Sequence, residues 1–288
     1  MILKSYSKLN LYLQVLNKRP DNFHSLFTIF ERIDLCDEII LKPRRDNLIR
    51  IICKDPAVPV DQTNLCYRAA DLLRKKFKLN KGVDIAIKKN IPVGAGLGGG
   101  SGNAACVLMG LNKLWKLDIS KERLKGLAAK IGSDVAFFIY ETPFAQGLGR
   151  GEKIRPIRVL KKTKLWHVLL VPKLHVSTPL IYNKFDLYSK LTPQKQSAKM
   201  LILALKKTHF LQVSENLFNS LEAITIRLYP KVQRAKFELE KLGVRAILMS
   251  GSGSAVFGIV TSRKEAFFLY RKLAKNKSLG RVFIARTV

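Results

Sequence analysis

Residues 92–105 read PVGAGLGGGSGNAA, and six of the nine positions from 94 to 102 are glycine. The stretch follows an alternating apolar segment, VDIAIKK at 83–89, and precedes NAACVLMGLNKLW at 103–115, which has the composition of a helix. A tight strand-to-helix turn needs a positive φ at only one or two glycines. Each further glycine costs roughly 0.5–1 kcal/mol relative to alanine, so six indicate that the backbone closely approaches a ligand.

A glycine-rich turn that leads into a helix is a common anion site, most often for phosphate. It gathers unpaired backbone N–H groups around one spot, and the helix dipole adds about half a positive charge. The P-loop version of such a site requires Gly-Lys-Ser/Thr, whereas residues 100–103 here are Gly-Ser-Gly-Asn. The protein-kinase version is excluded because the chain contains neither HRD nor DFG.

A dinucleotide-binding loop is a further alternative. Gly94, Gly96 and Gly99 satisfy GxGxxG, which is a weak match by itself. That fold also requires an uninterrupted strand before the first glycine and an acidic residue ending a second strand about 20 residues on. Pro92 interrupts the approach, and the acid at that distance, Asp118, precedes a predicted helix. The residues therefore predict a nucleoside triphosphate held by backbone amides, without a P-loop lysine.

Apolar patterning around the loop predicts a mixture of strands and helices. Alternation and β-branched residues predict strands, and apolar residues at helical spacing predict helices. The predicted strands are 4–16, 25–43, 48–54, 83–92, 165–173, 245–260 around a central glycine turn, and 281–288; the predicted helices are 65–77, one that begins near 101, 120–132, several within 194–241, and one before 281. Because these elements lack strict βαβ alternation, we predict an α+β fold with two domains, 1–157 and 158–288.

The charge of the chain is strongly positive. It contains 52 Lys and Arg against 21 Asp and Glu, a formal net charge of +31 and a pI near 10.2. Such an excess attracts polyanions, so nucleic acid and anionic membranes must be weighed. The basic runs, such as 42–45 and 74–81, are dispersed and carry no zinc-finger or helix-turn-helix pattern. We interpret them as solvated faces and predict neither a specific nucleic-acid partner nor a membrane partner.

Cysteine, histidine and apolar patterns predict a cytoplasmic protein without a structural zinc site. The four cysteines form no CxxC pair and the four histidines form no HExxH motif. Lys4 and Lys8 interrupt the segment that would be the apolar region of a signal peptide. No run approaches the roughly 18 apolar residues that a membrane span requires.

Five segments together resemble a known family of small-molecule kinases. They are the glycine-rich stretch at 92–105, KLNLYLQV at 8–15, RPDNFH at 19–24, IGSDVAFFI at 131–139 and MSGSGSAVF at 249–257. In this order they resemble the GHMP kinases, named for galactokinase, homoserine kinase, mevalonate kinase and phosphomevalonate kinase. RPDNFH narrows the resemblance to the 4-diphosphocytidyl-2-C-methyl-D-erythritol kinases. The resemblance extends over essentially the whole chain.

The resemblance implies a fold and a reaction. The fold is the two-domain α+β GHMP kinase fold, with the active site in the cleft between the domains. The reaction is the ATP-dependent phosphorylation of the 2-hydroxyl of 4-diphosphocytidyl-2-C-methyl-D-erythritol, in the non-mevalonate pathway of isoprenoid biosynthesis. The co-substrate is ATP with Mg²⁺, and the partner molecules are this small substrate and ATP.

The resemblance also assigns residues by their match to the family's motifs. Lys8 and Asp134 match the catalytic pair, in which the aspartate takes the hydroxyl proton and the lysine orients it and stabilises charge near the phosphoryl group. Residues matched to substrate binding are Asn10, Phe23, His24, Thr178 and Tyr182. Residues matched to ATP binding are Pro92, Val93, Gly94, Ala95, Gly96, Leu97, Gly98, Gly99, Gly100, Ser101, Asn64, Leu65 and Lys89.

The sequence departs from the family pattern at three positions. Phe23 replaces a tyrosine whose ring stacks on cytosine, so stacking is retained and a hydroxyl contact is lost. Asn22 replaces a glycine, and asparagine tolerates the left-handed backbone of a turn. Gly102 replaces the second serine of a Ser-Ser pair, so only the Ser101 hydroxyl remains beside the phosphates. For this reason the metal ligands stay unassigned.

Two alternatives remain open. The chain can be another GHMP kinase, acting on homoserine or a mevalonate derivative, and RPDNFH discriminates because those enzymes need no cytosine clamp. It can also be a basic RNA-associated protein, because the N-terminal half of this fold is shared with ribosomal proteins and a fold does not fix a function. The charge supports this second alternative, and the intact loops argue against it.

Overall fold

The computed structural model describes residues 1–160, 163–188 and 196–288. The strands are β1 (Ile2–Lys18), β2 (His24–Arg44), β3 (Ile49–Cys53), β4 (Gly82–Lys88), β5 (Phe144–Gly149), β6 (Lys153–Pro156), β7 (Trp166–Val171), β8 (Phe218–Asn219), β9 (Ala246–Met249), β10 (Val256–Val260) and β11 (Arg281–Arg286). The helices are α1 (Leu65–Lys76), α2 (Gly99–Leu114), α3 (Lys121–Ile131), α4 (Val135–Tyr140), α5 (Thr178–Tyr188), α6 (Ala198–Lys207), α7 (Phe210–Glu215), α8 (Glu222–Leu228), α9 (Pro230–Lys241), α10 (Arg263–Leu273) and the 3₁₀ turn η2 (Lys277–Leu279).

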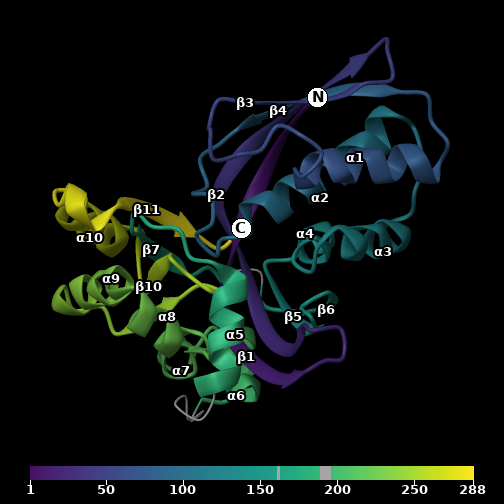
Figure 1. Ribbon diagram of the computed structural model, residues 1–288. Coiled ribbons are helices and arrows are strands. Elements are labelled where there is room, and N and C mark those ends of the chain that lie inside the picture. The colour runs from purple at the N-terminus through teal and green to yellow at the C-terminus, as the bar shows by residue number, and fades with distance from the viewer. Residues whose placement is uncertain (161–162, 189–195) are drawn as a thin grey trace.

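Two sheets organise the described residues. The first has seven strands, in the order β3-β4-β2-β1-β8, with β5 on β2 and β6 on β5. The second has four strands, in the order β11-β7-β10-β9. Strands β1 and β2 pair antiparallel over most of their length and reach from the α1 and α2 end of the molecule to α5 and α6, as Figure 1 shows. This long hairpin is therefore common to both halves of the chain.

The sheets and helices stack in layers around three apolar clusters. Helices α1 to α4 cover one face of the first sheet. Its other face packs against the second sheet through residues that alternate along the strands, such as Leu169, whose neighbour Leu170 points to the opposite face. That opposite face carries α5, α8, α9 and α10. Because both of its faces are covered, the short strand β7 is buried from His167 to Val171 and is apolar at every position except His167.

The two halves share a core and a buried polar network. Leu9 of β1 belongs to the same apolar cluster as Leu169 and Phe257 of the second sheet. Nearby, the Glu31 Oε1 of β2 accepts a hydrogen bond of 2.6 Å from Thr287 and lies 2.9 Å from His167 Nε2, and both Glu31 and His167 are fully buried. Residues 31, 167 and 287 come from distant parts of the chain, so the network ties β7 and the last residues to the first sheet.

Most elements predicted from the sequence are confirmed. The turn before β2 holds Asn22 at φ +62°, and α3 begins after the N-cap Ser120 and ends at Gly132. The helix after the glycines begins at Gly99 rather than near residue 101, because Gly98 in a left-handed conformation serves as its N-cap. Helices α4 and α5 and strands β5, β6 and β8 were not predicted. The domain boundary after residue 157 stays a prediction.

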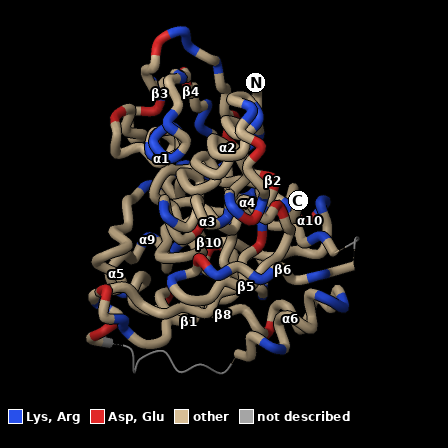
Figure 2. The backbone as a smooth tube through the Cα atoms, turned by 90° about the vertical axis from the view of Figure 1, so that its right-hand side faces the viewer, with Lys and Arg blue, Asp and Glu red and all other residues tan. Residues whose placement is uncertain are grey.

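Charged residues are spread over the whole fold. Lys and Arg lie on most elements in both halves, with Asp and Glu interspersed, as Figure 2 shows for the described residues. Among these residues, no helix combines the length and the apolar character needed to cross a membrane.

Candidate active site

The glycine-rich loop enters α2 through three left-handed residues. Gly94, Gly96 and Gly98 have φ of +69°, +76° and +68°, a conformation that residues with a side chain rarely adopt. Gly98 is the N-cap of α2 and offers no side chain to accept from the N–H groups of the first turn. Those N–H groups and the positive end of the helix dipole therefore remain available for an anion.

Hydrogen bonds from both halves of the chain hold the loop in place. The Lys8 N–H of β1 donates to the Leu97 carbonyl at 2.9 Å. From the turn between β9 and β10, the Ser250 hydroxyl donates to the Gly96 carbonyl at 3.0 Å, and the Ala255 N–H donates to the Ala95 carbonyl at 3.1 Å. The loop is thus fixed by the first and the second sheet together.

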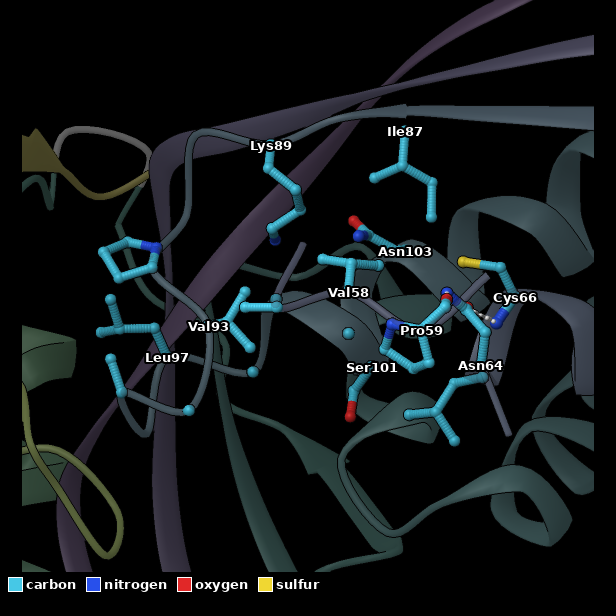
Figure 3. Close-up of a pocket in the computed structure, with 18 of the residues that line it drawn as sticks. Val58, Pro59, Asn64, Cys66, Ile87, Lys89, Val93, Leu97, Ser101 and Asn103 are labelled. Atoms are coloured by element: carbon cyan, nitrogen blue, oxygen red, sulfur yellow. Dashed lines mark hydrogen bonds between the residues drawn. The ribbon is translucent and has the colours of Figure 1, made fainter. Parts of the chain in front are cut away.

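A cavity of about 300 Å³ lies between the glycine loop and the segment that enters α1. In Figure 3, Val93 and Leu97 of the loop lie on one side of this cavity, and Val58, Pro59 and Cys66 lie on the other. The predicted ATP-binding residues, which are Pro92–Ser101, Asn64, Leu65 and Lys89, all line this cavity. Its apolar wall beside a phosphate-type helix terminus suits a nucleotide, with the base on the wall and the phosphates at α2.

Two polar residues of this set, Asn64 and Lys89, already have interaction partners within the protein. The Asn64 side chain caps α1 by accepting from the Cys66 N–H at 2.8 Å, and it donates to the Pro59 carbonyl at 2.6 Å. The Lys89 ammonium pairs with the fully buried Asp37, which also accepts from the backbone N–H of residues 90 and 91. Both side chains therefore shape the cavity walls in this structure.

Asn103 is a polar residue of this cavity that sequence reasoning missed. It lies in α2, is only 3 % exposed, and its Oδ1 has no hydrogen-bond partner in the described part of the chain. An unpaired buried acceptor is costly, so it is a group that a ligand can satisfy. Its position inside an otherwise small and apolar run, NAACV, is the signal that could have identified it.

Lys8 and Asp134 lie at the other side of the loop. Lys8 Nζ is 3.4 Å from Asp134 Oδ2 and donates to Asn10 Oδ1 at 2.5 Å. The Lys8 side chain is 5 % exposed, whereas that of Asp134, which precedes α4, is 32 % exposed. The cation is thus buried against its partners, and the carboxylate remains accessible to a ligand.

The glycine loop directly contacts this pair. A Cβ atom at Gly98 would lie 2.9 Å from Cγ of Lys8, so the first turn of α2 rests on the lysine stem. Gly96 and Gly98 line the nucleotide-sized cavity and also a second, larger cavity of about 550 Å³. The Lys8–Asp134 pair therefore lies where an anion held by α2 would meet the contents of the larger cavity.

The predicted substrate-binding residues all line this larger cavity, together with Lys8 and Asp134. Asn10 is held by its contact with Lys8 and by donating to Thr28 Oγ1 at 2.8 Å. Thr178 of α5 hydrogen bonds to Ser252 at 2.7 Å. The ring of Tyr182 stacks on that of His24 at 5.2 Å, and burial, with a smaller contribution from Asp134, raises the Tyr182 pKa.

Arg150 is a second residue that sequence reasoning missed. Its guanidinium carbon lies 5.0 Å from the ring centroid of Phe23, which is 54 % exposed. Arg150 stands in the turn between β5 and β6, flanked by Gly149 and Gly151, both with positive φ. A cation between two glycines in a polar turn was a visible signal. Arg150 brings a positive charge to the lining of the larger cavity.

The departure at Gly102 has a structural cause. A Cβ atom there would lie 2.6 Å from the Tyr6 carbonyl oxygen and 3.0 Å from Ser5 Oγ. In this chain α2 packs closely against β1 at that point, so a side chain is excluded unless the backbone shifts. Ser101 lines the nucleotide-sized cavity, and Figure 3 shows its side chain directed away from Asn103.

Comparisons with known proteins agree with this geometry. Residues 64–142 match the GHMP kinases N terminal domain and residues 201–278 match the GHMP kinases C terminal domain. A 4-diphosphocytidyl-2-C-methyl-D-erythritol kinase of Bacillus velezensis is 43% identical over 270 residues, which is 94% of this chain and 91% of the relative.

Solved structures extend the comparison to the fold. A crystal structure of a 4-(cytidine 5'-diphospho)-2C-methyl-D-erythritol kinase has a TM-score of 0.82 and 31% identity, covering 99% of this chain and 98% of the other. A mevalonate kinase from L. major has a TM-score of 0.75 at 14% identity, covering 100% and 95%, which shows a shared fold alone. The chain therefore belongs to the GHMP kinases, and within them to the family of 4-diphosphocytidyl-2-C-methyl-D-erythritol kinases.

Proposed function

We propose that this chain transfers the γ-phosphoryl group of ATP to the 2-hydroxyl of 4-diphosphocytidyl-2-C-methyl-D-erythritol, in the cytoplasm, as a step of the non-mevalonate isoprenoid pathway. The observation that carries the proposal is the junction of two cavities. Gly96 and Gly98 line both of them, and the Lys8–Asp134 pair stands at that junction. The Bacillus velezensis relative and the solved structure at 31% identity are both named as kinases of this compound.

The reaction follows from this arrangement. ATP occupies the smaller cavity, with its phosphates at the first turn of α2, and the cytidine compound occupies the larger one. The hydroxyl oxygen forms a bond to the γ-phosphorus, the bond from that phosphorus to the β,γ-bridging oxygen breaks, and ADP leaves. The hydroxyl proton passes to Asp134. Because phosphoryl transfer depends mainly on positioning and charge stabilisation, Lys8 acts by orienting Asp134 and by neutralising charge beside the phosphoryl group.

Asn10 and Arg150 have supporting roles in this proposal. Asn10 Oδ1 receives a hydrogen bond from Lys8 Nζ and so fixes the ammonium beside Asp134. Arg150, in the lining of the larger cavity, supplies a cation for the substrate's diphosphate. Both co-substrates are polyanions, so the net positive charge of the chain attracts them.

Magnesium fits this site as a complex with ATP. Proteins commonly hold Mg²⁺ through one or two carboxylates together with substrate phosphates, and no cluster of three His, Cys, Asp or Glu occurs among the described residues. Ser101 in the smaller cavity and Asp134 in the larger one are two side chains that would offer oxygen to the ion. The ion would supply neutralisation of phosphate charge, beside the chain's own Lys8.

A coupled assay of ADP release tests the proposed function. ATP is offered with the cytidine compound, and with homoserine and mevalonate as alternative acceptors. We expect turnover with the cytidine compound to exceed that with either alternative by several orders of magnitude in kcat/KM. Comparable turnover of homoserine or mevalonate, or none with any acceptor, would contradict the proposal.

Replacing Phe23 with alanine is expected to weaken the binding of the cytidine substrate but not that of ATP. Stacking of a base on an aromatic ring contributes roughly 1–3 kcal/mol, so the KM for the cytidine compound is expected to rise about tenfold while the KM for ATP changes less than twofold. Steady-state kinetics with each substrate varied in turn measure both values. Phe23→Tyr is the control and is expected to match the wild type or improve on it, and an unchanged KM in Phe23→Ala would remove the stacking role.

A further inference from the structure

The His24 side chain is enclosed by one face of α5. Its ring stacks on that of Tyr182 at 5.2 Å, meets Phe185 edge-on at 6.4 Å, and its Nε2 lies 2.5 Å from Asp186 Oδ1. Tyr182 and Asp186 are four residues apart on a helix and therefore share a face. The imidazole is 5 % exposed, so these contacts replace nearly all of its solvent.

The contact with Asp186 decides which ring nitrogen carries a proton. An ionised carboxylate can only accept hydrogen bonds, so His24 must donate from Nε2. Burial alone would raise the pKa of Asp186, but Lys18 and His24 together lower it, which keeps this carboxylate ionised near neutral pH. Asp186 also pairs with Lys18 at 2.9 Å, but that ammonium is 52 % exposed, so this pair contributes less than the buried His24 contact to holding α5 against the start of β2.

This contact joins lining segments of the larger cavity that come from the two halves of the chain. His24 begins β2 directly after Phe23, and both residues line the larger cavity. Tyr182 and Asn183 of α5 line it from the C-terminal half. Asp186 is not among the cavity's lining residues, so it reaches the substrate only through His24.

We propose that Asp186 is a positioning residue for the substrate cavity: it clamps α5 to the β1–β2 turn, fixes His24 with its proton on Nε2, and thereby sets the affinity for the cytidine part of the substrate. The proposal deepens the proposed function and rests on it for the identity of the ligand. Without the clamp, His24 and Tyr182 lose their relative placement and the cavity widens. The nucleotide-sized cavity shares no residue with the clamp and is unaffected.

Four variants and two readouts test the clamp. In Asp186→Ala we expect the KM and the Kd for the cytidine compound to rise about tenfold, with kcat and the KM for ATP within twofold of the wild type. Asp186→Glu is expected to restore most of the affinity and Asp186→Asn part of it. Lys18→Ala is the matched control, because it removes the exposed partner only, and is expected to change the KM less than twofold.

The second readout is independent of any substrate. Nitrogen-15 NMR of the histidine rings distinguishes protonated from unprotonated ring nitrogens, and with four histidines in the chain a His24→Gln variant assigns the signal. We expect Nε2 of His24 to be protonated and its signal to change in Asp186→Ala but not in Lys18→Ala. An unchanged signal, or an unchanged KM, overturns the clamp. Failure of the wild type to bind the cytidine compound by calorimetry, with the expected NMR result, contradicts the proposed function and leaves the clamp intact.

Discussion

Replacing Asp134 with asparagine is expected to lower kcat by about 10²–10⁴-fold with little change in either KM, because the carboxylate contributes mainly in the transition state. In Lys8→Met, kcat is expected to fall by a similar factor, while methionine keeps the aliphatic stem against which Gly98 packs. Steady-state kinetics measure kcat and KM, and circular dichroism establishes that each variant folds. A kcat within about threefold of the wild type in either variant would show that the Lys8–Asp134 pair is not catalytic.

The variant Asn10→Ala distinguishes two roles of Asn10, which are orienting the Lys8 ammonium and lining the larger cavity. Asn10 accepts a hydrogen bond from the Lys8 ammonium, and that ammonium in turn pairs with Asp134. If orientation of Lys8 matters, kcat falls in this variant too, though less than in Lys8→Met. A change confined to the KM for the cytidine compound would instead show that Asn10 acts only as a wall of the cavity.

Replacing Gly96 with alanine is expected to abolish nucleotide binding and to lower stability. A Cβ atom there would lie 2.1 Å from the Ser250 carbonyl oxygen, and a positive φ alone costs about 1–3 kcal/mol in a residue with a side chain. The loop must therefore shift away from the turn between β9 and β10. Thermal unfolding and calorimetry with ATP measure the two losses.

Gly100→Ala is the matched control for this prediction. Gly100 lies in the first turn of α2 with an ordinary φ, and the nearest atom to a Cβ there is Leu65 Cδ1 at 3.8 Å. Its stability is expected to stay the same or to rise, because alanine is the better helix former. A Gly100→Ala protein that folds normally but binds ATP weakly would place the phosphates against this turn. Normal ATP binding by folded Gly96→Ala protein would return the loop to a purely structural role.

Local patterns predicted those parts of the site that lie on one continuous segment. The strand, the glycine loop and α2 are decided by residues 83–115 alone, because alternation, positive-φ glycines and helical composition act over a few residues. Helix α5 was missed because its start, Thr178-Pro179, reads as a turn. Among residues 178–187, whose burial is described, only Ile181 and Phe185 are buried against the core. Its position is decided by contacts with the β1–β2 turn, which sequence periodicity does not record.

Side-chain partners could not be predicted where they join distant segments. Asp37, 52 residues from Lys89, pairs with the ammonium that was assigned to ATP binding. Arg150 reaches Phe23 only because β5 pairs with β2. Lys89 was predicted to bind ATP and lines the smaller cavity, whereas Arg150 was missed. In both cases the partner depends on strand pairing, and strand pairing is decided by the whole sheet.

The core and polar network shared by the two halves limit how such enzymes can recombine. A chimera that joins the first 157 residues of this chain to the remainder of a relative would set Leu9 and Glu31 against whatever residues that relative carries at the positions of Leu169, Phe257, His167 and Thr287. Productive crossovers would have to exchange both sides of that contact surface together. The chain changes sheet at the boundary between the halves, but a recombination crossover at that boundary does not by itself preserve the contacts between them.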